Sequence, residues 1–408
     1  MMYHAYQAHA DLMWPLRTAA RFTAPMLLDP AFDAFSFAGP ASPRQIAAAC
    51  KLLELAEITH ERPAWGIASV VVDGEPMPVF EEAVHSTPFA TLTRFSTPRS
   101  ATQQKVLLVA PMSGHFATLL RDTVRTMLQG HEVYITDWHN VRDVPLAAGR
   151  FGLDEYTEHL MRFLEVIGPG AHLMAICQPC VSALSAVALM SEEGHPATPS
   201  SLTLMAGPID CRINPTEVNK LATSRPIDWF ERTLISHVPL GHRGAGRRVY
   251  PGFVQLTAFM SMNRERHATA FREYYQHLLD DEPEKAEVTR TFYEEYLAVS
   301  DLSADFYLET VRLVFQEHAL PCGALTYRGR AIDPAAIRRT ALLTIEGERD
   351  DICSIGQTLA AQDLAKSLRP HLRTHYVQPG VGHYGVFSGR RWQNQIYPMV
   401  RDVIQVSR

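Results

Sequence analysis

The stretch that decides the fold is Ala171-His172-Leu173-Met174-Ala175-Ile176-Cys177-Gln178-Pro179-Cys180, which continues into the small-residue run 181–190. An apolar run leads directly into Cys177, and this pattern predicts a strand, a tight turn and a helix. Pro179 suits the first helical turn, where its missing N–H costs no hydrogen bond within the helix. The sequence therefore predicts a cysteine on a sharp turn between a strand and a helix.

Such a turn resembles the nucleophile elbow of α/β-hydrolases, which lifts a reactive side chain above the strand ends and directs backbone N–H groups at a developing oxyanion. The usual elbow reads Gly-x-Ser-x-Gly, whereas this one carries Ala175, Cys177 and Pro179. Ala175 is small enough for the crowded side of the turn, so the geometry can be kept. We expect Cys177 to act as a nucleophile.

The elbow also predicts where its partners lie, because α/β-hydrolases place an acid after a late strand and a histidine after the last strand. The predicted strand 341–346 leads to Asp350 and Asp351, and the predicted strand 373–378 leads through a Gly-rich loop to His383. We expect His383 to accept the thiol proton and Asp350 to orient the imidazole. Asp351 is the alternative acid, with a turn or helix cap as its other role.

Oxyanion donors are expected from two backbone segments. The N–H of Gln178 would be one donor, and the loop 110–116 after the first parallel strand would supply the other, from Met112 or Ser113. The sequence does not choose between these two. His115 in the same loop is either a substrate contact or part of a polar helix start.

The rest of the chain predicts an α/β fold, the α/β-hydrolase fold, with a mostly parallel sheet and a helical cap inserted between late strands. Strands are expected at 105–110, 132–136, 171–176 and 201–205, with helices near 116–129, 154–167 and 179–193, and the alternation resumes from 341 to 406. The expected organisation is residues 1–207 as the N-terminal part of the hydrolase core with a helical and hairpin extension over 1–96, residues 208–338 as the cap, and residues 339–408 as the C-terminal part of the core. A separate helical domain is the alternative to the cap.

Composition excludes several classes of protein. The 408 residues are 46% hydrophobic and 20% charged, which suits a large buried core. A net charge of −6 argues against nucleic acid as the main partner. The basic group Arg243, Arg247 and Arg248 is interpreted as a solvated loop, with an anionic-surface contact as the alternative. No apolar run reaches the roughly 18 residues of a membrane-spanning helix.

The cysteines and the N-terminus predict a cytoplasmic protein. Six cysteines are scattered along the chain, unlike the dense framework of a small secreted domain, and no signal-peptide pattern opens the sequence. Cys177 and Cys180 spell the redox spacing Cys-x-x-Cys, but the surrounding α/β pattern favours a hydrolase over a thioredoxin-like site. No second ligand pair supports a zinc site, so we expect neither a metal nor a cofactor.

Motifs along the whole chain resemble one family, the intracellular polyhydroxyalkanoate (polyhydroxybutyrate) depolymerases of bacteria. The matching stretches are Ala110-Pro111-Met112-Ser113-Gly114-His115, Ile176-Cys177-Gln178-Pro179, Gly207-Pro208-Ile209-Asp210, Asn214-Pro215-Thr216, Asp305-Phe306-Tyr307-Leu308, Glu346-Gly347-Glu348, Asp350-Asp351-Ile352 and Gly382-His383-Tyr384-Gly385. The resemblance implies a thiol hydrolase that cleaves stored amorphous poly(3-hydroxybutyrate) at granules in the cytoplasm. It implies Cys177, Asp350 and His383 as the catalytic triad, acting through a thioester acyl-enzyme without a cofactor.

Three rival functions stay open at the level of sequence. A polyhydroxyalkanoate synthase-like acyltransferase shares the Cys-Asp-His chemistry, although resemblance to it would imply a glycine-flanked elbow. A different thiol esterase is the broader alternative, and a non-catalytic granule-associated protein is the alternative from another class. The sequence leaves open oligomerisation, the side-chain length of the polymer, the role of Cys180, and the balance between hydrolysis and transfer to coenzyme A.

Overall fold

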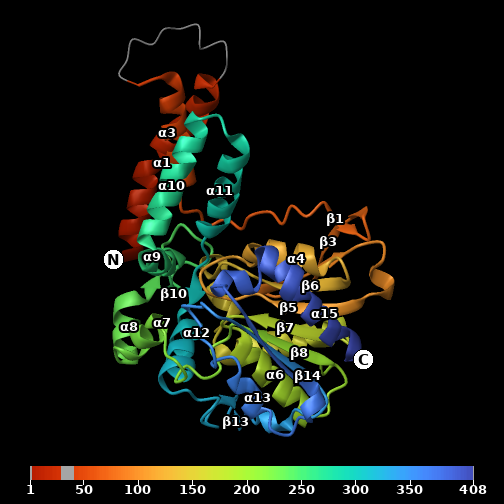
Figure 1. The fold of residues 1–408 in the computed structure, drawn as a ribbon. Helices are drawn as coiled ribbons and strands as arrows, with labels where there is room; N and C mark the ends of the chain where they lie inside the picture. The colour runs from red at the N-terminus through yellow and green to blue at the C-terminus, as the bar shows by residue number, and fades with distance from the viewer. Residues whose placement is uncertain (1, 29–40, 408) are drawn as a thin grey trace.

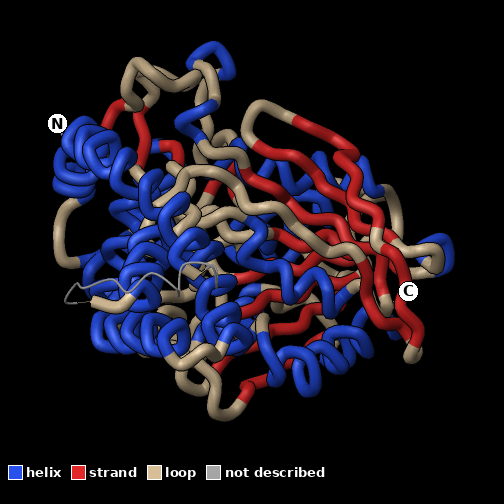
Figure 2. Tube along the Cα trace, turned by 90° about the horizontal axis from the view of Figure 1, so that it is seen from above, coloured by secondary structure: helices blue, strands red, loops and turns tan. Residues whose placement is uncertain are grey.

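The computed structural model describes residues 2–28 and 41–407, and an eight-stranded sheet forms its centre (Figures 1 and 2). The sheet order is β15-β14-β8-β7-β5-β6-β4-β3. The strands are β3 (Phe80–Ser86), β4 (Ala90–Ser96), β5 (Gln104–Val109), β6 (His131–Trp138), β7 (His172–Ile176), β8 (Ser201–Met205), β14 (Ala341–Gly347) and β15 (Arg373–Gln378). Pairings from β6 to β15 are parallel, and β3 and β4 form an antiparallel edge. The predicted α/β-hydrolase fold is confirmed.

Helices cover both faces of this sheet, which explains why its central strands are continuously apolar. One face carries α4 (Arg121–Met127) and α15 (Tyr397–Val406), and the other carries α6 (Cys180–Glu192) (Figure 1). The helix α5 (Leu153–Ile167) packs beside α6. Every residue of β7 and β8 is buried. The layers therefore fix the strand ends on which the candidate site depends.

The N-terminal residues form helices and a hairpin, as the sequence predicts. Helix α1 (Met2–Leu27) is followed by α3 (Pro43–Leu55), whose cap Ser42 forms a capping box with Gln45. The strands β1 (Ser69–Val72) and β2 (Glu75–Pro78) turn at Asp73 and Gly74, which have φ values of +51° and +84°. Two left-handed residues are what a tight hairpin turn requires.

The chain between β8 and β14 divides into two parts. One part lies beside the sheet and contains α7 (Glu217–Thr223), α8 (Ile227–Leu234), α9 (Gly252–Met262), α12 (Ala304–Glu309) and the short strands β9 (Ser236–His237), β10 (Arg248–Tyr250), β11 (Leu302–Ser303), β12 (Thr326–Tyr327) and β13 (Arg330–Ala331). The other part, α10 (Arg264–Leu279) and α11 (Pro283–Tyr296), projects from the body together with α1 and α3 (Figure 1). We call these four helices the helical arm.

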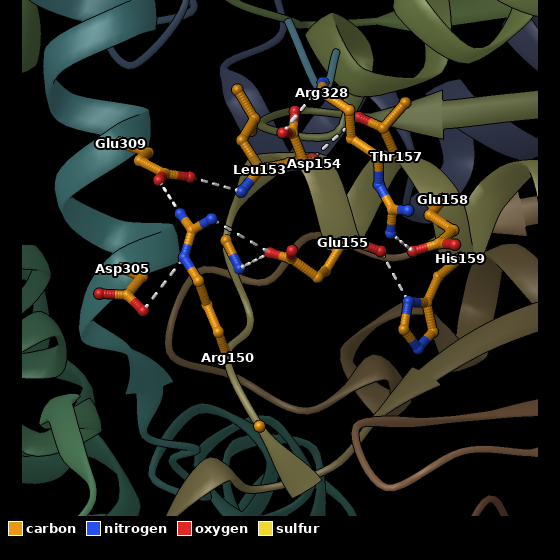
Figure 3. Close-up of polar contacts among 12 residues, drawn as sticks. Arg150, Leu153, Asp154, Glu155, Thr157, Glu158, His159, Asp305, Glu309 and Arg328 are labelled. Carbon is orange, nitrogen blue, oxygen red and sulfur yellow. Dashed lines mark hydrogen bonds and ion pairs between the residues drawn. The ribbon is translucent and has the colours of Figure 1, made fainter.

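Polar contacts join the inserted segment to the start of α5. Glu309 at the end of α12 accepts the Leu153 N–H at 2.8 Å and forms an ion pair with Arg150 (Figure 3). Arg150 also lies 3.5 Å from Asp305, within the stretch 305–308 that carries part of the family resemblance. A carboxylate at a helix N-terminus is favourably placed for the helix dipole. These contacts tie the insertion to the sheet body.

One sequence interpretation is wrong. The loop that holds Arg247 was expected to be solvated, yet Arg247 is buried and its guanidinium donates to the carbonyls of Val144, Pro145 and Gly149. The planar guanidinium has five N–H donors and can satisfy several carbonyls at once. Only Arg243 and Arg248 of the group are exposed. Separately, no helix within residues 2–28 and 41–407 combines the length and apolarity needed to cross a membrane.

Candidate active site

Cys177 occupies a strained turn between β7 and α6. Its φ is +66°, in the left-handed region that residues other than glycine seldom adopt. The Cys177 N–H donates to the Met205 carbonyl at 2.8 Å, and the Cys180 N–H returns to the Cys177 carbonyl at 3.1 Å. The side chain of Cys177 is partly exposed, whereas Cys180 is buried. The turn therefore presents one thiol and hides the other.

Cys180 packs beneath the turn against the end of β8. Its thiol faces the carbonyls of Ala175 and Met205 at 3.4 and 3.7 Å. Burial raises the pKa of the Cys180 thiol, and the Cys177 charge raises it further. A thiol in this environment is poorly suited to redox exchange, because exchange needs a thiolate. The geometry thus favours a packing role for Cys180.

Gly207 explains how this packing is possible. A Cβ atom added at Gly207 would lie 2.2 Å from both Cβ and Sγ of Cys180 and 3.2 Å from the Cys177 carbonyl oxygen. Only glycine fits here without displacing the helix start. Gly207 lies in one of the stretches that resemble the depolymerase family, and its contact with Cys180 cannot be predicted from adjacent residues.

His383 and Asp350 meet at the ends of β15 and β14. His383 Nδ1 and Asp350 Oδ2 lie 2.7 Å apart, and both side chains are buried. The other oxygen of Asp350 accepts the N–H groups of Ile352 and Cys353 at 2.9 and 2.8 Å. Asp351 is exposed instead. The structure therefore brings Asp350, and not Asp351, to the histidine.

The charge state of His383 reflects its neighbours. Burial alone would lower the pKa of His383, but the Cys177 and Asp350 charges and their hydrogen bonds to the ring raise it well above its ordinary value. The Cys177 side chain lies close enough to the imidazole for its charge to act on the ring. A protonated imidazole between these two groups is the expected form, because both neighbours favour the cation.

The loop after β5 offers free backbone donors. In the described part of the chain, no acceptor receives the N–H of Met112, Ser113 or Gln178. The same loop is fixed from the other side, because the Gly114 carbonyl accepts the Ser300 N–H at 2.9 Å. Such preorganised donors suit a developing oxyanion.

His115 in this loop is a structural residue. It is buried, its Nε2 lies 3.1 Å from the Tyr296 carbonyl oxygen, and burial lowers its pKa to about 4. The neutral ring therefore fixes the loop to the end of α11. Of the two interpretations of His115, the structure favours the scaffold role.

Glu346 is a buried residue that the sequence interpretation missed. Its carboxylate accepts the N–H groups of Gly356, Thr358 and Leu359 at 2.8 to 3.0 Å. Thr358 in turn accepts the Gly207 N–H at 2.8 Å. Glu346 thus joins the acid loop to the segment behind the elbow. The sequence feature that could have revealed this role is the position of Glu346, an acidic residue near the end of the otherwise apolar strand β14.

Comparison with known proteins finds a family match for the C-terminal half of the chain. Residues 206–408 match the family model described as "PHB de-polymerase C-terminus". No curated protein sequence matches the chain significantly. The family model covers the segments that carry Asp350 and His383, while Cys177 lies before its first residue.

Solved structures of hydrolases are similar in outline. A candidate lipase of Acinetobacter baumannii AYE has a TM-score of 0.45 at 14% identity, covering 80% of this chain and 93% of its own. The 2-hydroxy-6-oxo-6-phenylhexa-2,4-dienoate hydrolase of Rhodococcus sp. strain RHA1 has a TM-score of 0.41 at 12% identity, covering 81% and 99%. A thioesterase domain from the curacin biosynthetic pathway has a TM-score of 0.42 at 12% identity, covering 80% and 99%. Because these TM-scores and identities are low, the assignment of the fold rests on the strand order of the sheet and not on these structures.

Proposed function

We propose that this chain, a carboxylic ester hydrolase, cleaves poly(3-hydroxybutyrate) with Cys177 as its nucleophile. Its residues 206–408 match the polyhydroxybutyrate depolymerase family, which supports this substrate. His383 serves as the general acid and base, and Asp350 positions the imidazole. The observation that carries the proposal is the arrangement of three chain segments. A strained elbow presents Cys177 beside a buried His383 that is held by Asp350 at 2.7 Å.

The chemistry proceeds in two balanced steps. The Cys177 sulfur, which has passed its proton to His383, attacks an ester carbonyl and forms a tetrahedral intermediate, which collapses to a thioester as the C–O bond breaks. His383 donates its proton to the leaving alkoxide, which departs as the hydroxyl end of one polymer fragment. His383 then takes a proton from water, and the hydroxide breaks the thioester. This releases the carboxylic acid and leaves the Cys177 sulfur without its proton beside protonated His383, as at the start of the cycle.

The oxyanion of each intermediate needs two donors. We assign the Gln178 N–H as one, and the N–H of Met112 or Ser113 as the other. Removing one such donor from a hydrolase typically costs about 10² to 10³ in kcat. The proposed steps use groups of this chain alone. We further propose that the substrate is stored polymer inside the cell, so that the enzyme acts at the granule surface in the cytoplasm.

The experiment incubates the full chain with amorphous poly(3-hydroxybutyrate) granules and measures released 3-hydroxybutyrate and oligomers. Cys177→Ala is expected to lower the rate by at least about 10³-fold, because no other group replaces the nucleophile. Cys180→Ser is the matched control, and it should retain most of the activity. Release by Cys177→Ala at the wild-type rate would overturn the assignment of the nucleophile.

The same assay separates the rival functions. Granule binding without release of soluble products by the wild type would favour a non-catalytic granule protein. Incorporation of 3-hydroxybutyryl-coenzyme A into polymer would favour the synthase-like acyltransferase. Hydrolysis of small esters without attack on polymer would favour a different thiol esterase.

A further inference from the structure

We propose that the exposed face of α1 docks on the surface of an uncharged polyester and holds the polymer at the helical arm, an inference that rests on the proposed function. This face, which we call the α1 face, is formed by Leu12, Pro15, Leu16, Ala19, Phe22 and Met26. These positions recur at the three- and four-residue spacing that places side chains on one side of a helix. Leu12 is 76% exposed and Phe22 is 72% exposed.

No residue of the α1 face is charged, and the exposed Asp11 borders the face at its N-terminal end. The two arginines of α1, Arg17 and Arg21, both pair with Glu57 at the end of the neighbouring helix. The outer side of α11 is charged instead and carries the pairs of Arg290 with Glu287 and Glu294. On α11 only Val288 and Phe292 are exposed large apolar side chains, so most of the exposed apolar surface in the described part of the arm lies on α1.

The dimensions of the α1 face argue against a second copy of the chain as its partner. The α1 face is one helical stripe of six residues, about 21 Å long from Leu12 to Met26. A stable dimer interface takes about 20 to 30 residues from each partner. A deformable polymer surface can fold around the helix and also contact its flanks, so a single helical stripe is enough to hold it.

The charges of α1 argue against a phospholipid membrane. Helices that lie on anionic membranes carry Lys or Arg along the polar border of their apolar face. The basic side chains of α1 that could do so are directed to Glu57. A polyester is uncharged along its length and offers ester carbonyls as acceptors. Trp14, which is exposed on another side of the same helix, carries an indole N–H donor that suits this chemistry where the polymer contacts the flanks.

The helical arm and the candidate active site share a junction. Thr118, just after the candidate oxyanion loop, donates to Glu295 of α11 at 2.7 Å, and His115 contacts the Tyr296 carbonyl. At the other side of the junction the Tyr3 hydroxyl of α1 donates to Asp301 at 2.7 Å. The arm that would hold the polymer is therefore anchored at the segment that positions the oxyanion donors.

The test compares a triple variant, Leu12→Gln with Leu16→Gln and Phe22→Gln, with two control variants. Leu240→Gln removes an apolar side chain that is 93% exposed outside the arm, and Val288→Gln removes one that is 73% exposed on α11. Binding to amorphous poly(3-hydroxybutyrate) particles is measured by co-sedimentation in the Cys177→Ala background. Hydrolysis of p-nitrophenyl butyrate is measured with Cys177 intact.

The triple variant is expected to weaken particle binding by about tenfold or more, since three apolar contacts are lost. Its kcat/KM on p-nitrophenyl butyrate should stay within about twofold of wild type, and both controls should bind like wild type. Unchanged particle binding by the triple variant overturns the proposal. Equal losses on particles and on the small ester also overturn it, because they would indicate a structural role for α1.

Three further readouts separate the alternatives. A wild-type dimer that becomes monomeric in the triple variant would assign the α1 face to a second copy and overturn the proposal. Stronger α1-dependent binding to phosphatidylglycerol vesicles than to polyester would overturn it in favour of a membrane. If particles bind through α1 but no polymer is hydrolysed by the wild type, docking stands and the proposed depolymerase function fails.

Discussion

The sheet body and the helical arm use apolar residues in opposite ways. In the body, all residues of α6 from Cys180 to Met190 are buried, so the helix that follows the candidate nucleophile is held on every side. In the arm, α1 buries only Tyr3, Ala20 and Ala24 along 26 residues and leaves large apolar side chains exposed. A reactive group needs a rigid, fully packed support, whereas a docking element needs accessible apolar surface. The contrast suggests a division between chemistry and surface recognition.

The largest effect should come from the acid of the body. Asp350→Asn is expected to lower kcat/KM on a soluble ester by roughly 10² to 10⁴-fold, because the imidazole loses the group that fixes its orientation and charge. The Asp350 charge also raises the pKa of His383, so its removal should lower that pKa and move the alkaline limit of activity to lower pH. The measurement is a pH profile of kcat/KM.

Asp351→Asn is the matched control for this prediction. Asp351 is exposed beside Asp350, so its variant should keep both the rate and the pH profile of the wild type. A larger loss from Asp351→Asn than from Asp350→Asn would exchange the roles of the two acids.

A packing change in the body should have the next largest effect. Gly207→Ala places a Cβ atom 2.2 Å from Cys180, and the resulting displacement of the elbow should destabilise the chain by about 1 to 3 kcal/mol. Denaturant unfolding measures the loss, and Cys180→Ala in the same chain should restore part of it. Gly241→Ala is the control, since no atom lies within 4 Å of a Cβ added there. Equal effects of the two glycine substitutions would contradict this packing argument.

The anchor of the arm should give a smaller, pH-dependent effect. Burial raises the pKa of Asp301 to about 6, while the Gly252 N–H and the Tyr3 hydroxyl act to lower it. Tyr3→Phe removes one of these donors and should cost about 1 to 2 kcal/mol. Activity on a small ester should change little, because the body keeps its contacts.

The sign of the pH dependence follows from the raised pKa. The folded value lies above that of an unfolded aspartate, so the contribution of Asp301 to stability is greatest at low pH and is lost as the pH rises through about 6. Tyr3→Phe raises this pKa further, so the difference in unfolding free energy between wild type and variant should be larger at pH 8 than at pH 5. A constant difference would show that Asp301 does not sense this hydroxyl.

The smallest effect should come from the contacts between the insertion and the body. Glu309→Gln removes the ion pair with Arg150 but keeps an acceptor for the Leu153 N–H, so less than about 1 kcal/mol should be lost. Glu158→Gln, which removes the exposed pair with Arg328, should have no measurable effect (Figure 3). Thermal unfolding checks both. A loss of several kcal/mol from Glu309→Gln would show that this pair, and not apolar packing, holds the insertion.

Much of the body could be predicted because its signals are local. The strand 201–205 was predicted to the residue, and the strands at 171–176 and 341–346 differ by one residue at one end. The hairpin turn at Asp73-Gly74 and the helix cap at Ser42, within the helical and hairpin extension expected over 1–96, likewise depend on a few adjacent residues. The alternation expected to resume after residue 341 holds only a short α-helix between β14 and β15, α13 (Ala360–Leu364), because the segment before it forms turns around Glu346.

The arm could not be predicted as one unit. Each of its helices has an ordinary helical pattern, but α1 and α3 lie more than 200 residues from α10 and α11 in the sequence. Which helices pack together depends on the path of the chain between them, and helical periodicity carries no information about that path. For the same reason, the solvent exposure of Leu12 and Phe22 could not be predicted from the sequence.

The sequence by itself determined the type of fold, the turn that carries Cys177, and the chain order in which an acid and a histidine follow it, because these features depend on adjacent residues and on strand order. Tertiary structure alone decided that Asp350 and not Asp351 faces His383, that Gly207 must make room for Cys180, that Arg247 is buried, and that α1 presents an apolar face to solvent. These outcomes depend on contacts between segments far apart in the chain, where packing and hydrogen bonding select one neighbour among several that the local sequence allows equally.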